Sequence, residues 1–372
     1  MTDHPTWGRG RDPRTLGVMD AAFVGAVSAR CAEVVREPLD DLPDLPGLAD
    51  FLAPAQELTA GGKRGRARLC AAGWRAVGGA ELAEPLIGAG CALELFQAAA
   101  LVHDDVIDDA ATRRGRPASH VRFAALVAGG APDPARFGAN AAILLGDLLL
   151  VLAQREMRRA ADLVPDHRSA ALRIWEVMTA EVAVGQYLDV RASTGELLEE
   201  PLETALDRSL TVIRHKSARY SVEHPLVLGA ALAGGSPGLL ASLSRVGEPL
   251  GEAFQLRDDD LGVFGDPAVT GKPAGDDLRE GKRTPIVHLG LALAAPEDTA
   301  FLRARLGDPT LSAADVDRIR AILIGSGARE RHESLIADRH RRATEAIAAA
   351  PLDAETRSAL HALAGALTRR TA

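Results

Sequence analysis

The chain has 372 residues, a formal net charge of −8, and 47% hydrophobic against 25% charged residues, a composition typical of globular proteins that excludes wholesale disorder. The acidic balance and an aromatic content of only 3% argue against nucleic-acid binding, which relies on basic patches and stacking aromatic side chains. Three cysteines, Cys31, Cys70 and Cys91, lack the spacing of a disulfide framework or a zinc site. Because the sequence shows neither an apolar signal core nor a run of about 18 uncharged apolar residues, we expect a cytoplasmic protein without a membrane span.

Residues 1–18 are rich in Gly, Pro, Arg and Asp, which predicts a flexible N-terminal tail. From there on, the apolar residues recur mostly at helical spacing. The clearest predicted helices cover 80–107, 137–160, 169–193, 202–219 and 237–264, and amphipathic helices follow over 296–372. Alternating strand patterns are essentially absent, so we predict a single all-α domain over 19–372 with about a dozen helices.

Three polar segments interrupt this pattern, at 61–66 (GGKRGR), 109–120 and 265–284. The third has about 20 residues, and loops of that length inside a compact domain are usually functional or disordered. The first contains two adjacent glycines, which let the backbone approach an anion, followed directly by basic residues.

The first acidic cluster lies at the end of the helix predicted over 80–107. Asp104 and Asp108 are four residues apart and therefore share one face of that helix, with Asp105 beside them. Carboxylates at this spacing repel one another and weaken a helix unless another charge compensates. A divalent cation is the natural candidate, although a solvated helix end is the ordinary explanation for a run of charges.

A second cluster, Asp258, Asp259 and Asp260, follows another long apolar run. Oxygen ligands without nearby Cys or His favour Mg²⁺, which takes one or two carboxylates and completes its shell with water or phosphate. Basic residues suited to phosphate binding accompany both clusters: Lys63, Arg64, Arg66, Arg113, Arg114, Lys216, Lys272 and Lys282. For any one lysine a structural ion pair is the better explanation, but the set together indicates a phosphate ligand bridged by metal.

In this order the motifs resemble those of the trans-isoprenyl diphosphate synthases, or polyprenyl synthetases. The likeness rests on GGKRGR at 61–66, ALELFQAAALVHDDVIDDAATRRGRP at 92–117, GQYLD at 185–189, HKS at 215–217, and FQLRDDD with TGKP and REGKRT over 254–284. The resemblance implies a large helical bundle with a central apolar cavity, the isoprenoid synthase fold, and commonly a homodimer. It also implies a prenyltransferase that condenses isopentenyl diphosphate with an allylic diphosphate.

The same resemblance implies roles for individual residues. Asp104 and Asp108 would bind Mg²⁺ on the allylic diphosphate with help from Asp105, and Asp258 and Asp259 would bind it from the opposite side, with about three ions in all. The allylic diphosphate would contact Arg113, Lys216, Lys272 and Lys282. Lys63, Arg66, Gln97 and Arg114 would hold the diphosphate of isopentenyl diphosphate, and Ser217 and Gln255 would line the reacting centre.

The sequence departs from the family pattern at several of these motifs. Gly262 stands where the family usually has the third aspartate of the second cluster, and Ala67 stands in place of a proline. Gln97 replaces a histidine found in many members, and Ser217 replaces the commoner threonine while keeping its hydroxyl. At Gly262 we expect weaker support of the metal rather than loss of activity.

Product length is predicted from the residues that precede Asp104. Ala99 and Ala100 lie about one helical turn before it, where bulky aromatic residues in the family stop growth at fifteen carbons. The two alanines leave room for elongation, and Phe96, about two turns before the aspartate, would form a floor. We therefore expect geranylgeranyl diphosphate as the product, with farnesyl or longer diphosphates as alternatives, although the alanines also suit an ordinary Ala-rich helix.

Two other classes of protein stay open. A class I terpene cyclase shares the first aspartate motif but needs no second diphosphate site, which GGKRGR and RRGRP indicate. A non-catalytic subunit of a heteromeric synthase would not need both aspartate sets, although Gly262 keeps that alternative open. Incubation of the protein alone with isopentenyl diphosphate and an allylic primer separates all three.

Overall fold

The computed structural model describes residues 17–42, 45–79, 82–193, 200–265, 275–308 and 310–369. These residues are almost entirely helical, and their only strands are two of two residues each. The fold therefore confirms the predicted all-α class. Residues 1–16 of the predicted tail lie outside the described residues, whereas 17 and 18 already belong to the first helix.

The chain forms two compact units. The N-terminal unit comprises Pro13–Trp175 and Pro225–Ser236, and the C-terminal unit comprises Glu176–His224 and Pro237–Ala372. The boundary between them falls inside the helices α7 (Arg168–Ala192) and α9 (His224–Leu232) and at the start of α10 (Pro237–Phe264). A single domain over 19–372 stays a prediction.

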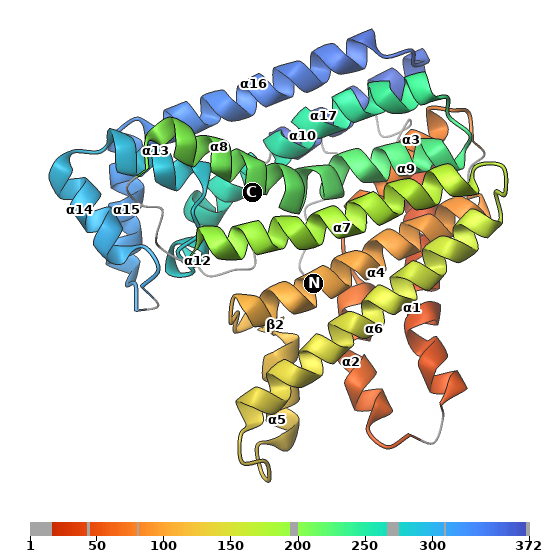
Figure 1. Ribbon diagram of the computed structural model, residues 1–372, viewed down its shortest axis with the longest axis horizontal. Coiled ribbons are helices and arrows are strands. Elements are labelled where there is room, and N and C mark those ends of the chain that lie inside the picture. The colour runs from red at the N-terminus through yellow and green to blue at the C-terminus, as the bar shows by residue number, and fades with distance from the viewer. Residues whose placement is uncertain are drawn as a thin grey trace. The chain divides into compact units, whose positions relative to one another are not determined.

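The N-terminal unit is organised around α4 (Glu84–Ile107). Its other elements are α1 (Gly17–Asp41), α2 (Leu48–Ala60), α3 (Gly65–Arg75), β1 (Thr112–Arg113), β2 (Arg116–Pro117), α5 (Ser119–Val127) and α6 (Pro134–Asp162), with the first part of α7 and most of α9. Helix α4 packs along α6, and the two lie side by side in Figure 1. Both coincide closely with predicted helices.

Helix α4 can occupy the core because small residues dominate its middle. Pro85 stands in its first turn, where the missing N–H costs no hydrogen bond. A Cβ added at Gly90 would lie 3.0 Å from Cγ2 of Val27 on α1, and one at Gly88 would lie 3.1 Å from Cβ of Ala160 on α6. Larger side chains at these glycines would force the helices apart, at a cost of about 1–3 kcal/mol.

Helices α4 and α6 are the two described helices that are long and apolar enough to cross a membrane, judged by length and composition alone. Most of the apolar stretch of α4 is buried inside the protein, as is usual for a core helix. Helix α6 is less buried and exposes apolar side chains at Phe137, Ile143, Leu144, Leu150 and Val151. Length and composition alone are therefore weak evidence that either helix crosses a membrane.

The C-terminal unit is organised around α10, which coincides with the helix predicted over 237–264. Its other elements are the rest of α7, α8 (Leu202–Val212), η1 (Ile213–Glu223), α12 (Asp276–Arg279), α13 (Pro285–Leu293), α14 (Pro296–Arg305), α15 (Ala313–Gly325), α16 (Ala328–Ala349) and α17 (Ala354–Thr368). Helix α16 packs along α10 (Figure 1). The predicted loop 265–284 contains α12, and its residues 266–274 lie outside the described residues.

Element η1 is where the structure departs from the predicted helix over 202–219. Helix α8 ends at Val212, and the chain continues as a π-helix, a rare conformation that frequently lies at functional sites. Two glycines let neighbouring helices approach it. A Cβ at Gly185 of α7 would lie 2.4 Å from the backbone N of Lys216, and one at Gly251 of α10 would lie 2.3 Å from the carbonyl O of Ala218.

Candidate active site

The first acidic cluster lies at the C-terminal end of α4, as predicted. Asp104 and Asp105 belong to the last turn, and Asp108 is the cap residue, whose N–H donates to the carbonyl of Asp104 at 2.8 Å. The C-terminus of a helix carries a partial negative charge, so carboxylates there need a cation nearby. Burial sharpens that need, because the side chain of Asp105 is 2% exposed and that of Asp104 is 22% exposed.

Arg113 supplies part of the compensating charge. Its Nε donates to Oδ1 of Asp105 at 2.7 Å, and its Nη2 lies 3.7 Å from Oδ2 of Asp104. Burial raises the pKa of Asp105, and the hydrogen bond from Arg113 opposes that rise. Arg113, which the resemblance assigns to the allylic diphosphate, is thus bonded to Asp105 here.

The strands β1 and β2 fix the position of Arg113. They pair antiparallel, with Arg113 opposite Arg116, which leaves Arg114 and Gly115 as a two-residue turn. Both turn residues have positive φ, 54° and 72°, as in the type I′ turn that matches the twist of a hairpin. The RRGRP motif therefore encodes a tight hairpin with Arg114 exposed at its tip.

A group of cations forms beside this hairpin, at the loop between α2 and α3. The guanidinium of Arg114 lies next to Gly62, close to that of Arg64. Arg64 is buried, donates to Oγ of Ser28 at 3.1 Å, and lies 3.5 Å from Oε2 of Glu94. Sequence reasoning missed Glu94, since an isolated glutamate in an apolar helix gives no indication of its partner on another element.

Three predicted diphosphate ligands, Lys63, Arg66 and Gln97, belong to the loop between α2 and α3, to α3 and to α4. Lys63 is exposed in that loop, and Arg66 is half-buried in the first turn of α3. Gln97 is half-buried on α4, one turn after Glu94. The first turn of a helix directs backbone N–H groups outward, so this part of the N-terminal unit suits an anion.

The predicted chain-length residues lie on the buried part of α4. Ala99 is fully buried and Ala100 is half-buried. Phe96 meets Trp175 edge-on, with ring centroids 5.8 Å apart and planes at 70°. Trp175 is buried, and its indole N–H donates to Oε1 of Gln154 at 2.5 Å. Sequence reasoning missed Trp175, because nothing in the sequence places position 175 opposite Phe96.

The second acidic cluster lies near the end of α10, and its members have different surroundings. Asp260 is buried and accepts a hydrogen bond from Nε of Arg329 at 3.0 Å. Asp259 is 6% exposed, and its Oδ1 accepts from Nε2 of Gln255 at 2.9 Å. The other oxygen of Asp259, Oδ2, is buried and accepts no hydrogen bond from any described residue. Asp258 is half-buried beside it.

Electrostatics confirm that Asp259 is the unusual member of this cluster. Burial raises its pKa well above the ordinary value, Gln255 opposes the rise, and the charges of Asp277 and Asp258 add to it. Among the described residues no three His, Cys, Asp or Glu side chains form a group that could hold a metal ion. A cation at Asp259 would therefore need water or phosphate oxygens as further ligands, which Mg²⁺ commonly takes.

Asp277 of α12 also belongs to this region, although sequence reasoning gave it no role. A Cβ added at Gly262 would lie 1.8 Å from Oδ2 of Asp277. Nζ of Lys282 lies 3.6 Å from Oδ1 of Asp277 and 2.6 Å from Oε2 of Glu280. Lys272, the other predicted ligand in this segment, lies outside the described residues.

The π-helix η1 carries Lys216 and Ser217. Nζ of Lys216 donates to Oδ2 of Asp189 on α7 at 2.6 Å, with both side chains about one fifth exposed. Ser217 is half-buried on the same helix. Asp189 ends the GQYLD motif, so this motif holds η1 twice, through Gly185 and through the ion pair with Lys216.

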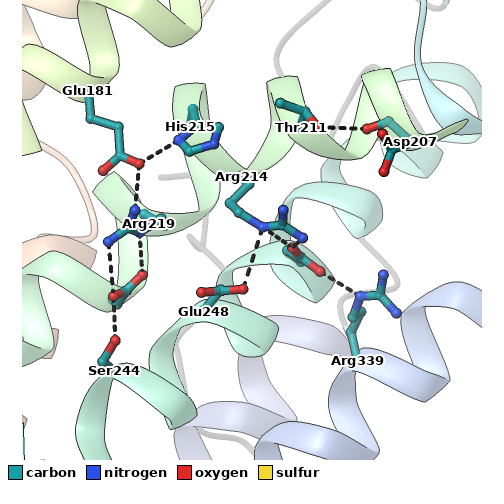
Figure 2. A network of polar contacts seen from close by, with 11 residues as sticks. Glu181, Asp207, Thr211, Arg214, His215, Arg219, Ser244, Glu248 and Arg339 are labelled. Atoms are coloured by element: carbon teal, nitrogen blue, oxygen red, sulfur yellow. Dashed lines mark hydrogen bonds and ion pairs between the residues drawn. The ribbon is translucent and has the colours of Figure 1, made fainter. Parts of the chain in front are cut away.

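A half-buried carboxylate on α7, that of Glu181, anchors η1 from the same side. Figure 2 shows Glu181 accepting hydrogen bonds from His215 and from Nη1 of Arg219, the latter at 2.7 Å. Nε2 of His224 donates to its second oxygen at 2.8 Å. Burial alone would raise the pKa of Glu181, but the bonds from His224 and His215 and the charge of Arg219 lower it to about 2.

The predicted residues thus fall into two sets. Those of the N-terminal unit are Lys63, Arg66, Phe96, Gln97, Ala99, Ala100, Asp104, Asp105, Asp108, Arg113 and Arg114. Those of the C-terminal unit are Lys216, Ser217, Gln255, Asp258, Asp259 and Lys282. Each unit therefore contains carboxylates and cations together, an arrangement suited to an anion bridged by a metal.

Comparison with known proteins gives these sites a context. The family model described as polyprenyl synthetase matches residues 49–323. A geranylfarnesyl diphosphate synthase from Aeropyrum pernix is 31% identical over 84% of this chain and 92% of its own length. A geranylgeranyl diphosphate synthase from Mycobacterium tuberculosis is 32% identical over 83% of this chain and 87% of its own length.

Solved structures agree with the sequence relatives. The crystal structure of a geranylgeranyl pyrophosphate synthase from Corynebacterium glutamicum, complexed with isoprenyl diphosphate and magnesium, is 36% identical to this chain. The similarity covers 95% of this chain and 99% of that one, with a TM-score of 0.87. The all-α fold seen here is therefore that of known prenyl diphosphate synthases.

Proposed function

Because the chain belongs to the polyprenyl synthetase family and is a trans-prenyltransferase, we propose that it condenses isopentenyl diphosphate with an allylic diphosphate to give geranylgeranyl diphosphate. The observation that carries the product length is the pair Ala99 and Ala100 on α4, with Phe96 seated against Trp175 one turn deeper. The relatives include synthases of different product length, so the length rests on these residues.

We propose that Mg²⁺ is the metal and that Asp104 and Asp108 hold it in the N-terminal unit, with Asp258 and Asp259 in the C-terminal unit. The donor set fits, because all four are hard carboxylates and Oδ2 of Asp259 is buried with no hydrogen bond from the described residues. When bound, Mg²⁺ stabilises the negative charge that develops on the departing diphosphate.

The protein's cations complete that stabilisation. Lys216 and Lys282 would contact the allylic diphosphate, and the carboxylates of Asp189 and Glu280 hold their ammonium groups in place. Arg113 would share its charge between that diphosphate and Asp105. Fixed cations stabilise a leaving group more than mobile ones, because they need no reorganisation during the reaction.

The condensation then needs orientation more than acid–base chemistry. The allylic C–O bond breaks, the double bond of isopentenyl diphosphate attacks the resulting carbocation, and a new C–C bond forms. The released diphosphate takes the proton that leaves, so no protein base is required. Lys63, Arg66, Gln97 and Arg114 would hold isopentenyl diphosphate by its diphosphate, which fixes the direction of its double bond.

We also propose that the protein is a homodimer joined through α6. Its outer face exposes Leu144 (60%) and Val151 (64%), together with Phe137, Ile143 and Leu150. Covering apolar surface contributes about 25 cal/mol per Å², and a second copy of the same helix offers a matching apolar face.

Product analysis tests this proposal. The purified protein is incubated with Mg²⁺, labelled isopentenyl diphosphate and dimethylallyl, geranyl or farnesyl diphosphate, and the dephosphorylated alcohols are separated by chromatography. We expect a twenty-carbon alcohol, and none when a chelator removes Mg²⁺. Absence of condensation with every primer would contradict the proposal and favour a cyclase or a non-catalytic subunit.

The predicted role of Phe96 in setting product length is tested with a variant in the same assay. Phe96→Ala removes the ring that contacts Trp175 and is expected to lengthen the product. Phe301→Ala, which removes a phenylalanine of the C-terminal unit stacked under Arg318, is the matched control and should leave the product unchanged. An unchanged product in Phe96→Ala would show that Phe96 is no floor.

A further inference from the structure

Gly262 on α10 is the position at which the second acidic motif lacks a carboxylate. It lies three residues after Asp259, so the two neighbour each other on one face of the helix. The space of a side chain at 262 is nevertheless filled, because a Cβ there would lie 1.8 Å from Oδ2 and 2.7 Å from Cγ of Asp277. A carboxylate from α12 thus occupies the place that a residue at 262 would take.

A second observation, the oxygen of Asp259 left unbonded by the described residues, indicates that a cation binds near this carboxylate. Asp259 is 6% exposed, and its Oδ2 is buried without a hydrogen bond from the described residues. Nζ of Lys282 lies 3.6 Å from Oδ1 of Asp277, and a buried carboxylate oxygen such as Oδ2 of Asp259 is suited to a divalent cation.

We propose that Asp277 supplies, from α12, the third carboxylate that the motif lacks at Gly262, and that it positions the cation held by Asp258 and Asp259. Asp277 is then a positioning residue that acts on the metal through its ligands or its bound water. The inference rests on the proposed function in that it takes Mg²⁺ to bind at this cluster. It replaces the expectation that Gly262 weakens the support of the metal.

The proposal can be tested by removing the carboxylate at position 277 and introducing one at position 262. Three variants are compared with the wild type: Asp277→Ala, Gly262→Asp, and the double variant with both changes. Thermal unfolding is followed without divalent cation and across a titration of Mg²⁺ in the presence of inorganic pyrophosphate. Asp317→Ala, which removes a 76% exposed aspartate on α15, is the control for loss of one charge.

The expected results differ for each variant. Asp277→Ala should need about tenfold more Mg²⁺ for half of the rise in Tm, as is usual when a residue that orients metal ligands is lost. Gly262→Asp alone should lower the Tm without cation, because its side chain overlaps Asp277. The double variant should regain both the cation-free Tm and the wild-type Mg²⁺ requirement.

Two outcomes would overturn the inference. One is an unchanged Mg²⁺ requirement in Asp277→Ala when the wild type gains Tm from Mg²⁺. The other is a raised requirement that the double variant does not restore, since Asp277 would then be merely structural. Failure of the proposed function is distinct, because it would appear as absence of condensation by the wild-type protein.

Discussion

At the scale of single residues, the aspartates at the end of α4 divide into two kinds. Asp105 is buried and bonded to Arg113, whereas Asp104 and Asp108 are half-buried and lie one turn apart. A carboxylate already neutralised by a guanidinium has less to offer a metal ion. The division agrees with the proposal that Asp104 and Asp108 are the ligands and Asp105 an assistant.

Because Arg113 neutralises Asp105, we expect its removal to lower the stability of the folded protein. In Arg113→Ala the carboxylate of Asp105 stays buried without its partner, so the free energy of unfolding should fall by about 3 kcal/mol. Urea unfolding at neutral pH measures it. Arg116→Ala is the matched control, since this arginine of the same hairpin is 69% exposed and pairs with an exposed glutamate, and should cost less than about 1 kcal/mol. Equal losses would contradict the assignment.

Glu181 gives a prediction for acid stability. Its pKa in the folded protein is about 2, against 4.5 for the ordinary group. A lowered carboxyl pKa stabilises the folded protein above about pH 4.5, and that stability is lost as the pH falls toward 2. Glu181→Gln should therefore flatten the decline of the free energy of unfolding between those values. Glu176→Gln, an exposed glutamate on the same helix, should decline like the wild type.

Sequence could predict the site residues whose arrangement follows from their spacing along a single helix. Asp104 and Asp108 share a helix face in any α-helix, and the sequence alone places them at its end. The partner Arg113 of Asp104 could not be predicted, because its position depends on a hairpin. Nor could the position of Asp277 beside Gly262, because it depends on the short helix α12. The pair Asp189 and Lys216 joins two helices 27 residues apart in sequence, a distance at which spacing carries no information.

At the scale of elements, apolar periodicity located the long helices well. Helix α10 coincides with its prediction, and α4, α6 and α7 differ from theirs by a few residues at their ends. The π-helix η1 could not be predicted, since it continues an apolar pattern with a slightly longer period over only 11 residues. The strands β1 and β2 were also missed, because two residues are too few for an alternating pattern.

Close packing on η1 leads to a prediction for Gly185. In Gly185→Ala the new Cβ would lie 2.4 Å from the backbone N of Lys216, so α7 and η1 must separate and both stability and condensation rate should fall. Gly365→Ala is the matched control, because nothing lies within 4 Å of a Cβ at this helical position of α17. That change should instead stabilise the protein by about 0.5–1 kcal/mol. Urea unfolding and initial rates distinguish the two.

At the scale of the whole molecule, the exposed apolar face of α6 is a feature that a single copy leaves unexplained. We expect the wild type to sediment as a dimer and Leu144→Glu to sediment as a monomer, because the new charge would be buried in the proposed interface. Leu144 is 60% exposed in one copy. Leu126→Glu, at a 54% exposed position on α5, should stay dimeric. A monomeric wild type would contradict the proposed homodimer.

The winding of η1 has a consequence for the three residues that meet at Glu181. His215 and His224 are nine positions apart, which in an α-helix is about two and a half turns and would send them to opposite sides. A π-helix takes nearly one residue more for each turn, so the same nine positions make about two turns and return to one side. Both imidazoles can therefore reach a single carboxylate. Deleting one residue within Ile213–Glu223 would rewind this segment toward an α-helix and turn one histidine away from Glu181. The contacts of Glu181 therefore depend on the number of residues in this segment as well as on its side chains.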